Sequence, residues 1–107
     1  MTAPFVSSLR SRREPLRLAA PSGETISIRV QMPELWDVVR VEVGPGEPVS
    51  SVKRAVLAEL DPRAREADYV MKLRGFEVLD EQAALREAGA VNGSIFLLES
   101  RRRRPVR

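Results

Sequence analysis

The chain has 107 residues, contains neither cysteine nor histidine, and carries a formal net charge of +3. That length fits one domain of roughly 75 residues with flanking segments, and so small a domain has little volume to spare for a deep pocket. The missing residue types exclude disulfides, thiolate nucleophiles, imidazole bases and the usual zinc ligands, so we expect no enzyme, no metal and no cofactor.

The charge is unevenly distributed along the chain. Residues 26–99 contain nine Lys or Arg against thirteen Asp or Glu, so this part is acidic and the two ends are basic. An acidic domain argues against a nucleic-acid-binding face on the domain itself. No apolar run reaches the 18 residues of a membrane span, and the N-terminus does not resemble a secretory signal, so we expect a cytoplasmic protein.

Three segments are predicted. Residues 1–24 mix prolines, serines and arginines without a regular period, which favours a disordered basic N-terminal tail. Residues 25–99 form the domain. Residues 100–107 are too densely charged to pack and are expected to be a disordered, arginine-rich C-terminal tail.

The domain opens with a predicted hairpin followed by a helix. Apolar and polar residues alternate over 26–32 and again over 38–43, as in strands with one face on a core. The period then changes, and apolar residues recur every three or four positions on one helical stripe: Val49, Val52, Val56 and Leu60. Asp61-Pro62 ends this helix, and the side chain of Glu47, Ser50 or Ser51 is expected to cap its start.

Shorter elements complete the domain. Residues 69–74 are predicted as a third strand, 76–79 as a short edge strand, and 82–88 as a short helix with Leu85 facing inward. Gly89 suits the C-cap of that helix. Residues 95–99 are nearly all apolar, which is typical of a central strand.

The order of elements resembles the ubiquitin superfold, and several residues stand where that family has them: Val39, Val41, Val43, Val49, the Val52-Lys53 pair, Gly75, Leu85 and the segment 89–98. The resemblance extends to small bacterial ubiquitin-like proteins of the YukD type. It implies an α+β, ubiquitin-like β-grasp fold (ββαββαβ) with a mixed sheet packed on one helix. It also implies a non-catalytic module or accessory subunit that other proteins dock onto. We expect this module to be monomeric when free.

One feature of conjugated ubiquitins is missing. These proteins end in Gly-Gly, whereas no glycine follows Gly93 here. Since trimming cannot create a glycine, we do not expect conjugation through such an end. A modifier of a bacterial conjugation system that uses another terminal residue is the alternative.

The resemblance also indicates a docking surface on the outer side of the third and last strands, together with the first loop. If Met71, Leu73, Ile95 and Leu97 point inward, alternation leaves the other residues of these two strands facing a partner: Val70, Lys72, Arg74, Phe96 and Leu98. The first loop adds Leu35 and Trp36. The alternative is that loops or the twist of the sheet cover the aromatic and leucine side chains. Lys72 stands where ubiquitin has its central patch isoleucine, so we do not expect ubiquitin's own receptors to bind well.

The arginine cluster and Lys53 each have two interpretations, whereas three carboxylates have one. The cluster Arg101, Arg102, Arg103 and Arg104 is a solubilising end or a binder of anions, either nucleic acid or an anionic membrane. Lys53 is expected to form a structural ion pair, with a role as an isopeptide acceptor as the alternative. Asp61, Asp80 and Glu81 are interpreted as cap and turn residues, because no pocket is expected there to tune them for acid–base chemistry.

Overall fold

The two alternating segments pair with each other as predicted and form the first part of a six-stranded sheet. The computed structural model describes residues 14–21 and 23–101. In it β2 (Ile26–Met32) is antiparallel to β3 (Asp37–Val43), with Val30 opposite Val39. Between them lies a short 3-10 helix, η1 (Pro33–Leu35).

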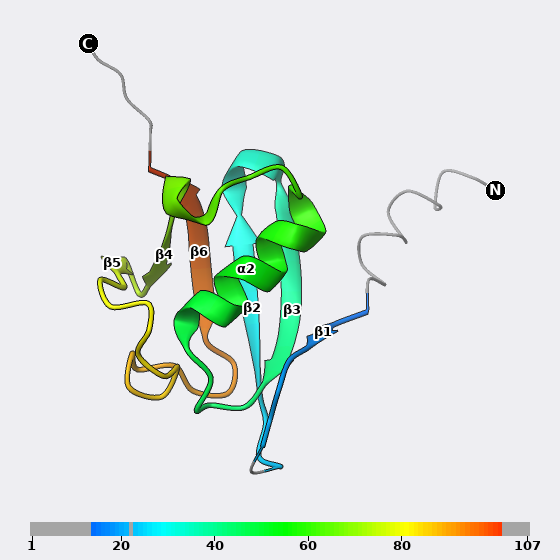
Figure 1. Ribbon diagram of the computed structural model, residues 1–107, viewed down its shortest axis with the longest axis vertical. Helices are drawn as coiled ribbons and strands as arrows, with labels where there is room; N and C mark the ends of the chain where they lie inside the picture. The colour runs from blue at the N-terminus through cyan, green and yellow to red at the C-terminus, as the bar shows by residue number, and fades with distance from the viewer. Residues whose placement is uncertain (1–13, 22, 102–107) are drawn as a thin grey trace, which may run out of the picture.

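The last strand lies in the middle of the sheet, as its apolar sequence predicted. β6 (Ile95–Ser100) is parallel to β2 and antiparallel to β4 (Tyr69–Leu73), which carries the two-residue edge strand β5 (Phe76–Glu77). The strand order is β1-β3-β2-β6-β4-β5. The helix α2 (Val49–Leu60) crosses one face of this mixed sheet (Figure 1). We call the opposite side of the sheet its outer face.

The core lies between α2 and the sheet. The predicted stripe is buried except for its last member, because Val49, Val52 and Val56 are fully buried and Leu60 is only partly so. They pack in one cluster with the inward residues of the hairpin: Ile28, Val30, Met32, Val39, Val41 and Val43. Each fully buried side chain of this size contributes about 1.5–3 kcal/mol, so the cluster fixes which side of each strand faces inward.

Backbone carbonyls of a distant loop, rather than a side chain, cap the start of α2. No side chain forms a cap hydrogen bond there, so the prediction of Glu47, Ser50 or Ser51 as the cap is wrong. Instead the amides of Val49 and Ser50 donate to the carbonyl oxygens of Ala83 (3.1 Å) and Glu81 (2.8 Å). These bonds tie the segment after β5 to the first turn of the helix.

The same bonds explain why the predicted helix over 82–88 is absent. The segment forms consecutive turns. The carbonyls of Glu81 and Ala83 bond to α2, and the amide of Leu85 donates to the carbonyl of Glu47 (2.8 Å), so these groups are not available for helical bonds. Leu85 still faces inward and is fully buried, as predicted.

The structure corrects both predicted boundaries of the domain. Within the segment assigned to a disordered tail, β1 (Leu16–Arg17) lies parallel to β3, and the amide of Gly44 donates to the carbonyl of Ala19 (3.0 Å). Half-buried Leu16 and Leu18 pack against the core. At the other end Ser100 belongs to β6. Residues 1–13 and 102–107, with Arg102, Arg103 and Arg104 among them, lie outside the described residues.

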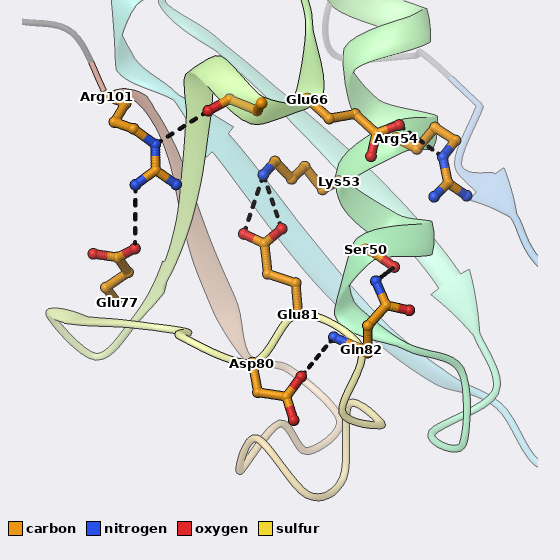
Figure 2. Close-up of polar contacts among 10 residues, drawn as sticks. Ser50, Lys53, Arg54, Glu66, Glu77, Asp80, Glu81, Gln82 and Arg101 are labelled. Carbon is orange, nitrogen blue, oxygen red and sulfur yellow. Dashed lines mark hydrogen bonds and ion pairs between the residues drawn. The ribbon is translucent and has the colours of Figure 1, made fainter.

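Arg101 is held by contacts rather than extended into solvent. Its amide donates to the carbonyl of Asp68 (2.7 Å) and its Nε to the carbonyl of Ala67 (3.1 Å), both at the end of η2 (Glu66–Asp68). Its guanidinium lies 3.8 Å from the carboxylate of Glu77 (Figure 2). In the described part of the chain, no helix is long and apolar enough to cross a membrane.

Candidate protein-docking surface

The last strand faces the opposite way from the prediction. Phe96 and Leu98 are fully buried, whereas Ile95 is 42% exposed and Leu97 is half-buried. Phe96 lies opposite Val30 of β2 and Leu73 of β4, and directly opposed residues share one face of a sheet. Since Val30 and Leu73 face the core, Phe96 must also do so. Phe96 and Leu98 are therefore not docking residues.

An all-apolar strand does not show which of its alternate residues face the core. In β6, Glu99 supplies this information. This carboxylate lies in the same alternation phase as Ile95 and Leu97, and it is paired with Lys72 at 3.0 Å. A charged residue rarely points into a core, so its parity places Ile95 and Leu97 on the outer face.

The side chains of β4 lie on the predicted faces of the sheet, but those on the outer face are less exposed than predicted. Lys72 lies on the outer face, opposite Leu97, and is half-buried. Val70 lies opposite Glu99 on the same face but is only 6% exposed, so it is not available to a partner. Arg74 is exposed but lies in the turn between β4 and β5, where it lines a different hollow.

The first loop presents its apolar residues as predicted. Leu35 is 42% exposed and Trp36 is 86% exposed. Trp36 ends η1 in the left-handed region (φ 55°, ψ 39°), with its amide donating to the carbonyl of Pro33 (3.1 Å). This conformation costs a residue with a side chain roughly 1–2 kcal/mol. A large aromatic side chain is thus kept at an unfavourable backbone position while almost fully exposed.

These residues form one continuous surface, which we call the outer-face patch: Trp36, Val38, Ile95, Leu97 and Lys72. Register shows the continuity, because Gln31 of β2 lies between Val38 of β3 and Leu97 of β6. Trp36 and Val38 line a shallow hollow of about 320 Å³ next to Gln31. An amide of Ser100 donates to Glu34 (3.1 Å), which fixes η1 against the end of β6.

A second apolar surface was missed by the sequence analysis. Phe76 is 77% exposed and Leu79 is 86% exposed, and both line an open hollow of about 380 Å³ between β5 and the turns that follow. Three acidic residues, Glu77, Asp80 and Glu87, line it together with the basic Arg74. The available signal was the pair of large apolar residues, Phe76 and Leu79, in a short segment that the sequence predicted only as an edge strand.

Lys53 forms the structural ion pair that the sequence predicted. Its side chain is 3% exposed, and its ammonium lies 2.9 Å from the carboxylate of Glu81 on the loop that caps α2 (Figure 2). Glu81 is thus an ion-pair partner as well as a turn residue. Asp80 acts as a turn residue, as predicted, by accepting a hydrogen bond from the amide of Gln82 (3.1 Å). The described residues include no group of three or more metal-ligating side chains close enough to hold an ion.

Comparisons with known proteins bear on the fold. A scan against models of protein families gave no match, and neither did a search of curated proteins. Solved structures do match. A ubiquitin-like domain of an Arabidopsis thaliana protein is 20% identical with a TM-score of 0.65, covering 83% of this chain and 90% of its own.

Two further structures come from distant organisms. The ubiquitin of Caldiarchaeum subterraneum is 18% identical with a TM-score of 0.65, covering 75% of this chain and 98% of its own. The C-terminal ubiquitin-like domain of mouse tubulin-specific chaperone e is 13% identical with a TM-score of 0.65, covering 82% and 98%. At such identities the likeness establishes the fold alone, and it confirms the predicted ubiquitin-like β-grasp architecture.

Proposed function

We propose that this chain, which has the fold of ubiquitin-like domains, is a non-catalytic docking module or accessory subunit that a partner protein binds through the outer-face patch. The observation that carries the proposal is the exposure of Trp36 (86%), Val38 (42%) and Ile95 (42%) on one continuous surface. Exposed apolar residues that gather on one face mark interaction sites, and Trp is a favoured anchor at interfaces.

The charges on the patch indicate what kind of partner fits it. Lys72 is neutralised within the domain by Glu99 at 3.0 Å. The large exposed groups on the patch are then the indole of Trp36 and the aliphatic side chains of Val38 and Ile95. The partner is therefore expected to present an apolar protein surface, with desolvation of Trp36 as the main source of affinity.

The test is affinity capture from native lysate with the tagged domain and two variants. The double variant Trp36→Ser and Leu97→Ser removes two apolar side chains from the patch. The control Leu79→Ser removes a leucine, as at Leu97, from the hollow beside β5. Proteins held by the wild type and by Leu79→Ser, but lost with the double variant, support the proposal. Equal capture by all three forms, at equal thermal stability, would contradict it.

Two alternatives from the sequence remain proposals. The first is a modifier of a bacterial conjugation system that uses a terminal residue other than glycine. It would appear as a covalent adduct that survives denaturing gels. The resemblance to bacterial YukD-type proteins, and binding of anions by the arginines that follow Arg101, also stay predictions.

A further inference from the structure

Two arginines face each other on the outer face of the β2–β3 hairpin. Arg29 lies directly opposite Arg40, and both are exposed. Like charges at directly opposed positions of an antiparallel pair destabilise a sheet. Residues 26–99 contain more acidic than basic residues, so the composition of the domain does not explain why both positions are arginine.

No carboxylate neutralises this pair among the described residues. The ion pairs found in that part of the chain include neither Arg29 nor Arg40. The nearest acid along the same face of β3 is Glu42, and it is paired with Arg17 on β1 at 3.2 Å. The two guanidinium groups thus leave about two positive charges unbalanced at one place on the sheet.

The side chains around the arginines are hydrogen-bond donors. Ser27, Arg29, Arg40, Asn92 and Gly93 line a hollow of about 210 Å³, and no carboxylate lines it. The Oδ1 atom of Asn92 already accepts a bond from the amide of Ser27 (2.8 Å), so its remaining free group is the NH₂ donor. The hydroxyl of Ser27 supplies a further O–H.

Gly93 lines one side of the hollow. Its amide donates to the carbonyl of Ser27 (2.7 Å), which fixes the turn before β6 against the start of β2. Its φ is +93°, a conformation that favours glycine, and a Cβ placed there would meet nothing within 4 Å. The backbone of Gly93 therefore lines the hollow in a conformation that this hydrogen bond holds in place.

We infer that this hollow, which we call the arginine-pair site, binds the phosphate group of a small ligand. Two guanidinium groups and two neutral donors match a group with nearly two negative charges and three acceptor oxygens, and a phosphate monoester is such a group. A single carboxylate would balance only half of the charge. The site adjoins the outer-face patch, because Arg29 lies directly opposite Ile95, but the two share no residue. Phosphate binding is measured without a partner protein, so its failure is distinguishable from failure of the proposed function.

The experiment is a titration of the full chain with inorganic phosphate, followed by amide chemical shifts at constant ionic strength. The expected result is saturable shifts at Ser27, Arg29, Arg40 and Gly93. Arg29→Gln and Arg40→Gln should each weaken binding about tenfold or more, since a charge-assisted bond is lost. Arg63→Gln is the matched control, because it removes the same charge from an exposed position after α2 and should leave binding unchanged.

Two further arms identify the ligand chemistry. Acetate at equal ionic strength should produce no saturable shifts at these amides. A phosphoserine tripeptide that binds more tightly than inorganic phosphate would assign the site to phosphorylated partners, and equal affinity would assign it to free phosphate compounds. Absence of saturable shifts with phosphate, equal binding of acetate, or an equal loss in Arg63→Gln would overturn the inference.

Discussion

Replacing Phe96 by Ala should remove a large part of the stability of the domain. Phe96 is fully buried between inward residues of β2 and β4, and truncating such a phenylalanine costs about 3–5 kcal/mol. A domain of this size has about 4–13 kcal/mol in total. The variant is therefore expected to unfold at much lower urea concentration, and to be largely unfolded if the wild type lies at the low end of that range.

Leu97→Ala is the matched control on the neighbouring residue. Leu97 is half-buried on the outer face, so its truncation should cost about 1 kcal/mol or less. Urea unfolding of both variants, followed by far-ultraviolet circular dichroism, gives the two free energies with equal m-values expected for wild type and control. A loss for Leu97→Ala as large as that for Phe96→Ala would refute the assignment of which side of β6 faces the core.

Three further predictions concern contacts outside β6. Glu81→Ala should destabilise the domain by about 3 kcal/mol in thermal unfolding, because it leaves the buried side chain of Lys53 without its carboxylate. An unchanged midpoint would show that the ion pair is not structural. Trp36→Gly should keep or raise stability by up to about 1 kcal/mol, since glycine adopts φ 55° without strain, and yet abolish partner capture; a large loss of stability would contradict this. Gly44→Ala should cost about 1–3 kcal/mol, because a Cβ there lies 2.9 Å from the backbone that follows β1, whereas Gly46→Ala meets only the end of a flexible arginine at 3.5 Å and should be tolerated.

The sequence predicted the elements whose pattern has a clear period. The alternation over 26–32 fixes Ile28 and Val30 on the inner face, and the helical stripe from Val49 onward faces them. Such patterns state both the type of element and the side that is buried. The order of the elements then sufficed to predict the fold.

The elements that the sequence did not predict depend on contacts between distant segments. β1 has only two residues and forms because β3 offers an edge beside it, which no local pattern reveals. The turns over 82–88 replace a helix because the carbonyls of Glu81 and Ala83 cap α2. Tertiary hydrogen bonds thus overrode the local preference in both places.

The exposure of the predicted docking residues follows the prediction in part. Trp36 is exposed in the first loop and Lys72 lies on the outer face, whereas Phe96 and Leu98 are buried. The run 95–98 is apolar on both faces, so its period carries no information on which side is buried. Only Glu99 and the register with β2 and β4 decide it, and register is a property of the assembled sheet.

Fluorescence of Trp36 tests the docking proposal most directly, because it is the only tryptophan in the chain and is 86% exposed. In the free protein its emission should be that of an indole in water. The titrant is a captured partner that lacks tryptophan, or one whose tryptophans are labelled so that they emit at a different wavelength. On binding, the emission of Trp36 should shift to shorter wavelength and become protected from iodide quenching. A complex that forms while the emission and quenching of Trp36 stay unchanged would show that the partner binds elsewhere.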